Sequence, residues 1–268
     1  MSTVYTNDKH YKEIASKIRT VLGTSDEYKP SEMPQAISSM TGSAVEDYST
    51  IVNGAMFNDD TATIIGTKMY AGTFAGSTVK RVEIPNGVTT ISKHAFHYSY
   101  VEEIIIPDTV QTFDANCFDN TYNLKHLDFP KNLRVLGYRC LALTNISENI
   151  VLPSSVNTIE DNAFMSSDFT GIELPSGVTS VGYAALSGCI YLKTLVIRAS
   201  SVLGVDEHKT PLSSSAISKG NGYIYVPSAL INSYKSNTYW SQYANQVRAL
   251  EDYTVDGTVT GAFDYSRV

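Results

Sequence analysis

Residues 82–96 read VEIPNGVTTISKHAF, and the pattern returns as IIIPDTVQTFDANCF at 104–118 and as LPSSVNTIEDNAF at 152–164. In each copy a short β-type run ends in proline, a valine follows three positions later, and phenylalanine follows eleven positions after the proline. A small residue precedes each phenylalanine. The prolines lie 22 or 23 residues apart, at Pro85, Pro107, Pro130, Pro153 and Pro175. A fixed period of this length indicates a stacked repeat protein.

A single repeat of this size cannot bury its own apolar side, so neighbouring repeats must bury it jointly. The residues one and three positions before each proline are apolar, as Val82 and Ile84 illustrate. This alternation predicts a strand with one buried face, and proline marks the end of the strand because it has no N–H group. The residue eleven after each proline should fill the centre of each turn, at Phe96, Phe118, Leu141, Phe164 and Leu186. The sequence therefore predicts a mainly β repeat solenoid.

The residue between the two inward positions of each strand should face outward. Along the repeats these residues are Glu83, Ile105, Asp128, Val151, Glu173 and Val196. Exposed aliphatic side chains on one sheet face would suit a partner surface, and Glu83, Ile105, Asp128 and Val151 are candidates for it. A β-sheet also tolerates β-branched residues on either face, so a purely structural role stays open.

Aromatic residues gather at the turn that follows the central residue. Tyr100 and Tyr122 lie four residues after Phe96 and Phe118, so they should occupy adjacent turns, with Tyr98 and His97 beside them. Tyrosine combines a large rigid contact area with a polar group, which suits recognition of a protein or a glycan. The alternative is a tyrosine ladder that only stiffens the coil.

Composition excludes several classes of function. The 268 residues carry a net charge of −7, with 18 tyrosines against 9 phenylalanines and one tryptophan. Broad nucleic-acid binding requires clustered Lys and Arg, which an acidic chain does not favour. No run of 18 apolar residues exists, so no membrane insertion is expected. The first residues show no apolar stretch typical of a signal peptide.

No motif for catalysis, nucleotide binding or a metal site is present. His94 and His97 have no cysteine or carboxylate at metal-ligand spacing, and we expect exposed turn histidines without a metal or cofactor. Cys117 and Cys140 hold equivalent places in adjacent repeats. A disulfide there is conceivable, but alanine fills the same place elsewhere, so buried free thiols are favoured.

The pattern IP-x-x-V-x-x-I-x-x-x-A-F resembles the BspA-type leucine-rich repeats of bacterial and phage proteins, over residues 63–200. The resemblance implies repeats of 22–23 residues and a solenoid over residues 43–200, and the absence of catalytic motifs predicts that the protein is not an enzyme. The segment from Tyr223 onward is similar to the piece that closes such repeats. It implies a strand at 223–226, a capping helix near 228–249, and a C-terminal cap over residues 201–268.

Residues 1–42 differ in kind, and we expect a small helical module there. One helical stripe contains Ile14, Ile18, Val21 and Leu22 and ends before a glycine. The segment IASKIRTVLGTSDEYKPSEMPQAISSM at 14–40 resembles a short N-terminal module of phage tail-associated and other virion proteins. This resemblance implies that the stripe attaches the chain to a virion. The alternative is that the helices only cap the first turn.

These features together predict a non-enzymatic virion structural protein of a phage, in the tail, baseplate, fibre or capsid surface. Its partners would be other virion proteins and a host cell-surface protein or glycan, and it would form a homo-oligomer, with a trimer as the fibre symmetry. The alternative is a BspA-like adhesin or protein-interaction module at a bacterial cell surface. Such an adhesin requires an export signal and an anchor, and neither is visible in the sequence.

Overall fold

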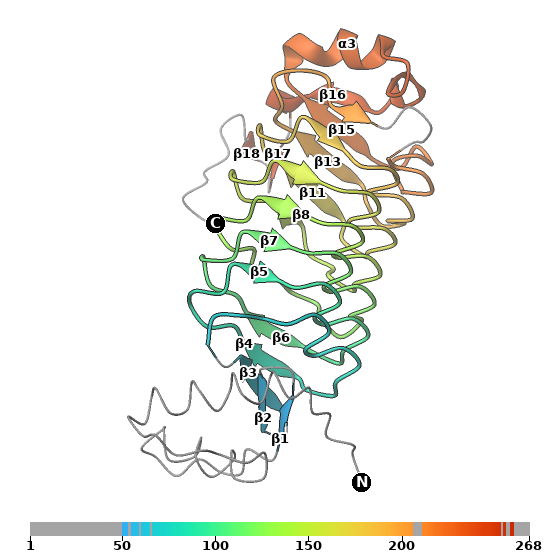
Figure 1. Ribbon diagram of the computed structural model, residues 1–268. Helices are drawn as coiled ribbons and strands as arrows, with labels where there is room; N and C mark the ends of the chain where they lie inside the picture. Colours follow the sequence, from blue (N-terminus) through green and yellow to red (C-terminus); the bar gives the residue numbers. More distant parts are fainter. Residues whose placement is uncertain are drawn as a thin grey trace.

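The computed structural model describes residues 50–52, 55–58, 60–64, 66–205, 211–252, 254–255 and 258–259. In these residues the chain winds into a solenoid of short parallel strands stacked along one axis (Figure 1). This confirms the predicted fold class. The helical module predicted for residues 1–42, with Ile14, Ile18, Val21 and Leu22, lies outside the described residues.

One column of parallel strands runs along each of two sides of the solenoid. The first column contains β3 (Thr61–Ile64), β4 (Arg81–Glu83), β6 (Glu103–Ile105), β9 (Ile150–Val151), β11 (Gly171–Leu174), β13 (Thr194–Ile197), β15 (Tyr223–Val226) and β16 (Val247–Ala249). The second contains β5 (Thr90–Ile91), β7 (Thr112–Phe113), β8 (Val135–Leu136), β10 (Thr158–Ile159), β12 (Ser180–Val181) and β14 (Gly204–Val205). Two antiparallel strands precede β3, namely β1 (Thr50–Val52) and β2 (Ala55–Asn58).

The strands pair in the register that the repeat period sets. Val82 pairs with Ile104, and Ile172 pairs with Ile150 on one side and Leu195 on the other. All the central residues of the predicted turns are buried. The rings of Phe74 and Phe96 are 4.9 Å apart and those of Phe96 and Phe118 are 5.2 Å apart, and both pairs are stacked. The core is therefore a continuous column of side chains shared between turns.

Small polar side chains inside the turns bind carbonyl groups of the preceding turn. Thr121 Oγ1 donates to the Phe96 carbonyl oxygen at 3.1 Å, Ser167 Oγ donates to that of Leu141 at 2.6 Å, and Cys189 Sγ donates to that of Phe164 at 3.1 Å. Buried carbonyl groups need such partners. These three side chains tie their turns to the preceding ones, whereas the hydroxyl groups of Ser77 and Ser99 at the same repeat position have no hydrogen-bond partner among the described residues.

The three cysteines are free and buried. Cys117 Sγ lies 3.6 Å from the carbonyl oxygen of Cys140, and Cys140 Sγ lies 3.9 Å from that of Ala163. Burial raises the pKa of the Cys117 and Cys140 thiols, and it raises the pKa of Cys189 to about 12. The favoured alternative of buried thiols is thus confirmed, and no disulfide joins the adjacent turns.

The C-terminal end begins with the predicted strand β15, but the helix expected near 228–249 is short. Its place is taken by η1 (Ser228–Leu230), α3 (Ile231–Ser236), η2 (Ser241–Tyr243), β16 and η3 (Leu250–Asp252). Asn237 ends α3 because its backbone is extended and its Oδ1 atom accepts hydrogen bonds from the N–H groups of Tyr239 and Trp240. Beyond β16, β17 (Thr254–Val255) pairs antiparallel with β18 (Thr258–Val259).

Aromatic side chains of this cap hold the backbone of Leu203 on both sides. The Leu203 N–H group donates to the hydroxyl oxygen of Tyr234 at 2.9 Å, and Trp240 Nε1 donates to the Leu203 carbonyl oxygen at 2.8 Å. The rings of Tyr234 and Trp240 are 5.5 Å apart, and Tyr243 packs on Trp240. Burial raises the pKa of Tyr234 to about 12. None of the helices in the described residues is long and apolar enough to cross a membrane.

We expect Phe118→Ala to lower the free energy of unfolding by about 3–5 kcal/mol, because the ring is fully buried between Phe96 and Phe113. Urea unfolding followed by circular dichroism measures the change. The exposed Lys125→Ala is the control and should stay within about 0.5 kcal/mol of the wild type. A loss below about 1 kcal/mol for Phe118→Ala would contradict the shared core.

Removing one hydroxyl group should test the cap. Tyr234→Phe leaves the buried N–H group of Leu203 without its acceptor, and we expect a loss of about 1–3 kcal/mol in the free energy of unfolding. Hydrogen exchange of the Leu203 amide should become faster. Tyr191→Phe changes a half-exposed tyrosine and should alter neither quantity. Unchanged exchange at Leu203 would rule out the proposed role of Tyr234.

Candidate functional site

The turn around each central residue contains two positions with left-handed backbone, two residues before and two residues after it. Around Phe96 they are His94 and Tyr98, with φ angles of 57° and 56°. For a residue other than glycine this conformation costs about 1–2 kcal/mol, so neighbouring structure must hold it. The N–H group of Tyr98 donates to the Asp119 carbonyl oxygen at 3.1 Å, and that of His94 donates to the Ala115 carbonyl oxygen at 3.0 Å. The next turn thereby fixes the sharp bend that carries Tyr98.

Tyr98, Tyr100 and Tyr122, which we call the tyrosine edge, are 55%, 58% and 47% exposed. The N–H group of Tyr100 donates to the Ser77 carbonyl oxygen at 2.9 Å, and the Tyr122 hydroxyl donates to Asn120 Oδ1 at 2.6 Å. Asn123 Nδ2 donates to the Tyr100 carbonyl oxygen at 3.4 Å, so the two tyrosines lie on adjacent turns. Within the described residues no ring contact joins Tyr100 to Tyr122.

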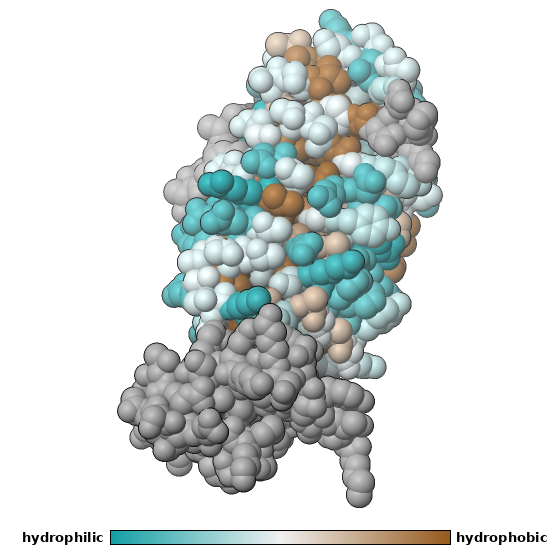
Figure 2. Space-filling view, viewed as in Figure 1, coloured by the Kyte–Doolittle hydropathy of each residue, from teal (hydrophilic) through white to brown (hydrophobic). Residues whose placement is uncertain are grey.

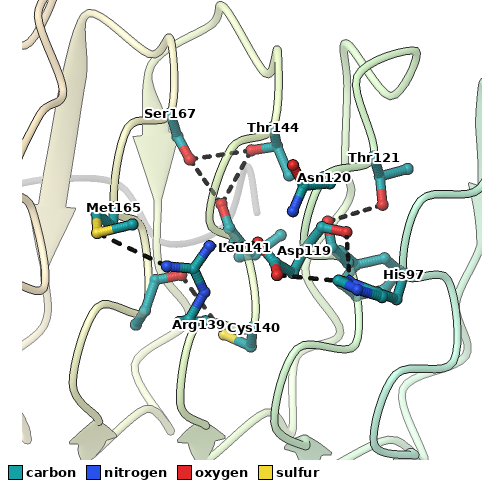
Figure 3. Close-up of polar contacts among 12 residues, drawn as sticks. His97, Asp119, Asn120, Thr121, Arg139, Cys140, Leu141, Thr144, Met165 and Ser167 are labelled. Carbon is teal, nitrogen blue, oxygen red and sulfur yellow. Dashed lines mark hydrogen bonds and ion pairs between the residues drawn. The ribbon is translucent and has the colours of Figure 1, made fainter.

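A buried ion pair lies at the same turns (Figure 3). The Asp119 carboxylate is 4% exposed, and its Oδ1 atom lies 3.0 Å from Nη2 of Arg139, whose side chain is 20% exposed. Its Oδ2 atom lies 3.4 Å from Nδ1 of His97. A charge buried to this degree is stable only with such partners. The backbone carbonyl oxygen of the same residue accepts the Tyr98 N–H group, so Asp119 links the ion pair to the turn that carries Tyr98.

Neither His94 nor His97 is an exposed turn histidine, so that expectation is wrong. Both are half-buried, with ring centroids 5.1 Å apart, and the His97 ring packs edge-on against Tyr98 at 4.4 Å. The Nδ1 atom of His94 is buried without a hydrogen-bond partner. Burial, followed by the nearby His97 and Lys93, lowers the pKa of His94. His97 thus supports Tyr98 by packing against its ring, and only part of the His97 side chain is exposed to a partner.

Sequence reasoning missed Asp119 and Arg139. His97 and Asp119 both follow a central residue by one position, so the repeat alignment could have placed them on adjacent turns. Arg139 comes from a different position, two residues before Leu141, and has left-handed backbone. Nothing in the sequence pattern indicates that its side chain reaches back to Asp119.

The second candidate surface is the outward row of the first strand column. Glu83, Ile105 and Asp128 are exposed, and Val151 is half-buried. The row does not stay exposed along the solenoid. Val196 is 1% exposed, and Glu173 is buried beside Arg198, whose Nε atom donates to its carboxylate. The outward surface is therefore confined to the N-terminal and middle turns.

Hydrophobic side chains form no wide patch on the face that Figure 2 shows. They make a narrow, broken stripe among hydrophilic residues. In the described part of the chain, no group of three or more His, Cys, Asp or Glu residues is placed to hold a metal ion. The arrangement around the tyrosine edge offers exposed aromatic contact area on a rigid support, which is what a binding surface requires.

We expect Arg139→Ala to lower the free energy of unfolding by about 3 kcal/mol, because it leaves the Asp119 carboxylate buried without its cation. The double variant with Asp119→Ala should lose less than the sum of the two single losses, since the isolated charge is then gone. Arg134→Ala, at an exposed arginine of the same turn, is the control. Denaturant unfolding measures all four variants, and additive losses would contradict the ion pair.

Comparison with known proteins adds a family match. Residues 67–200, half of the chain, match the BspA type leucine rich repeat region in six copies. No curated protein matches the chain. The match indicates no catalytic family.

Three solved structures are similar over part of the chain. A leucine-rich repeat protein from Bacteroides ovatus is 24% identical, with a TM-score of 0.47, over 66% of this chain and 51% of its own. A leucine rich repeat protein of T. pallidum is 20% identical, with a TM-score of 0.46, over 67% and 89%. A leucine rich cell surface protein from Faecalibacterium prausnitzii is 20% identical, with a TM-score of 0.41, over 59% and 57%. The chain thus spans about half the length of the first of these structures.

The family match covers the turns in which β4 and β6 pair in register and the rings of Phe96 and Phe118 stack. It begins before the turn of Phe74 and ends just after β13. The chain belongs to the BspA type leucine-rich repeat family.

Proposed function

We propose that this chain is a non-enzymatic protein-interaction module of a bacterial cell surface, and that it binds its partner through the tyrosine edge. The observation that carries the proposal is the exposure of Tyr98, Tyr100 and Tyr122 on adjacent turns whose backbone is held by hydrogen bonds. Tyrosine has few rotatable bonds, so a tyrosine on a rigid support loses little entropy when it binds. Such residues are frequent energetic centres of protein interfaces.

The repeat fold supports the same proposal. A solenoid presents an extended surface on which each turn contributes equivalent positions. In this chain the tyrosine edge occupies two neighbouring turns, and the Asp119–Arg139 ion pair links the second of them to the following turn. A surface that is ordered before binding avoids the cost of ordering it during binding.

The choice between a virion and a bacterial cell surface depends on which of the two sequence resemblances has support. The virion hypothesis rested on the segment 14–40, which lies outside the described residues, and none of the matches above concerns a phage protein. The cell-surface alternative rests on the repeats themselves, which the family match covers. We therefore prefer the bacterial surface to the virion, and the trimer remains a prediction without support.

A comparison of two triple variants tests the proposal. The first changes the tyrosine edge, with Tyr98→Ser, Tyr100→Ser and Tyr122→Ser. The second changes three tyrosines of similar exposure elsewhere, with Tyr138→Ser, Tyr191→Ser and Tyr223→Ser. Each protein is immobilised and exposed to extracts of cell-surface proteins, and the retained proteins are quantified by mass spectrometry.

We expect at least one protein to bind the wild type and the second variant equally and to bind the first variant at least thirtyfold more weakly. That ratio corresponds to the loss of about 2 kcal/mol that defines an interface hot spot. Equal retention by both variants would contradict the assignment of the tyrosine edge. Retention of nothing by the wild type would contradict the interaction module itself.

A further inference from the structure

The first strand column is interrupted at a single turn. β6 ends one sheet and β9 begins the next, and residues 125–129 between them form no strand. At this place the interior is partly open. Ile106 and Phe129 are half-buried, although residues at the same repeat position in other turns, Ile84 and Leu152, are at most 2% exposed.

A groove of about 530 Å³ lies over the interruption. Its apolar part includes Ile106, Phe129 and Val151, and its charged part includes Asp128 and Glu148. The groove is also lined by His126, Asp108 and Lys131. Apolar side chains thus lie beside carboxylates within one depression.

The three carboxylates of the groove do not all pair with the same cationic side chain. Asp108 has Lys131, whose Nζ lies 4.0 Å from Oδ2 of Asp108 and whose N–H group donates to Oδ1. Asp128 and Glu148 share His126, with Nε2 at 3.1 Å from Asp128 Oδ1 and Nδ1 at 2.5 Å from Glu148 Oε1. No other ion pair reaches Asp128 or Glu148 within the described residues.

Lys131 lines the same groove but pairs with Asp108, and in the described residues no cation besides His126 forms an ion pair with Asp128 or Glu148. Glu103 of β6 holds the same repeat position as His126 and pairs with Arg81 at 3.6 Å. The equivalent residue of the next turn is the neutral Asn149. Burial lowers the pKa of His126, whereas the negative charges of Glu148 and Asp128 raise it. The rise outweighs the burial effect, so the pKa of His126 lies above its usual value. Once His126 loses its proton, the carboxylates of Asp128 and Glu148 remain beside an apolar surface without a cationic ion-pair partner.

We propose that this groove binds a lysine or arginine side chain from an extended segment of a partner protein, with its aliphatic stem on Ile106 and Phe129 and its cationic group beside the carboxylates of Asp128 and Glu148, where it displaces the His126 ring. Lysine and arginine bury their stems on apolar surface while their charged ends pair with carboxylates. No other common side chain matches both parts of the groove. The proposal gives the partner of the proposed interaction module a chemical class, and it rests on that function.

The two carboxylates do not converge on a site for a metal ion. They contact opposite nitrogens of one imidazole ring, so an ion bound at either nitrogen would have only one of them beside it. The protonated His126 instead competes with the incoming cation for both carboxylates. Binding should therefore strengthen as the pH rises and His126 becomes neutral.

The probe is a fluorescently labelled peptide in which glycine alternates with lysine and arginine. Its control replaces lysine by norleucine and arginine by citrulline, which keeps the stems and removes the charges. Fluorescence anisotropy measures the dissociation constant at pH 5.5 and pH 8 for the wild type, Glu148→Gln, Asp128→Asn and His126→Gln. Glu102→Gln is the matched acidic control outside the groove, and circular dichroism checks that each variant is folded.

We expect saturable binding of the cationic peptide at pH 8, at least tenfold weaker binding by Glu148→Gln or Asp128→Asn, and unchanged binding by Glu102→Gln. Binding by the wild type should weaken severalfold at pH 5.5, and His126→Gln should remove this dependence. The proposal is overturned by equal binding of the norleucine peptide, by wild-type affinity in both carboxylate variants, or by a pH dependence that survives in His126→Gln.

The tyrosine-edge variant keeps the groove intact and should bind the peptide like the wild type. Failure of peptide binding would remove the groove proposal and leave the tyrosine edge untouched. Failure of partner capture by the tyrosine edge, with peptide binding intact, would do the reverse.

Discussion

Burial shared between adjacent turns is the constraint on which the whole structure depends. The central Phe96 is enclosed by Phe74 on one side and Phe118 on the other, and its N–H group donates to the Cys117 carbonyl oxygen at 2.7 Å. Each turn therefore obtains both its apolar contacts and its backbone hydrogen bonds from its neighbours. Among the described residues, ten other than glycine have left-handed backbone, and the N–H groups of eight of them donate to carbonyl oxygens of the next turn, which holds this conformation in place.

The two candidate binding surfaces arise from departures from this regularity. At the tyrosine edge the turn itself is regular, but the buried pair of Asp119 and Arg139 adds a polar link between turns and the side chains beyond it are large and aromatic. At the groove the backbone is irregular, and residues that belong to the interior reach solvent. We expect binding sites in a repeat protein where the backbone departs from the repeat or where a turn carries unusual side chains, since identical turns would not single out one site.

The sequence determines the regular part of the fold and little beyond it. The proline spacing and the apolar alternation predict the strands, their register and the buried central residues, because shared burial leaves one arrangement. The interruption at 125–129 has no such signal, since Leu127 and Phe129 keep the alternation of every other strand. The prediction of a helix near 228–249 is wrong in its length, because Asn237 ends α3 and residues 247–249 form β16, which pairs with β15. Local preference thus yields to strand pairing that no local pattern reveals.

The break between β6 and β9 has a mechanical consequence. At that level the second column is continuous, since Thr112 pairs with Val135 and Val135 with Thr158. The second column has its own break between β10 and β12, where β9 and β11 are paired through Ile150 and Ile172. The breaks in the two strand columns therefore lie at different levels along the solenoid axis. At each break the other column keeps its strand pairing. A force along the solenoid axis would therefore have to separate paired strands at either break, and separation in one column would not by itself part the turns.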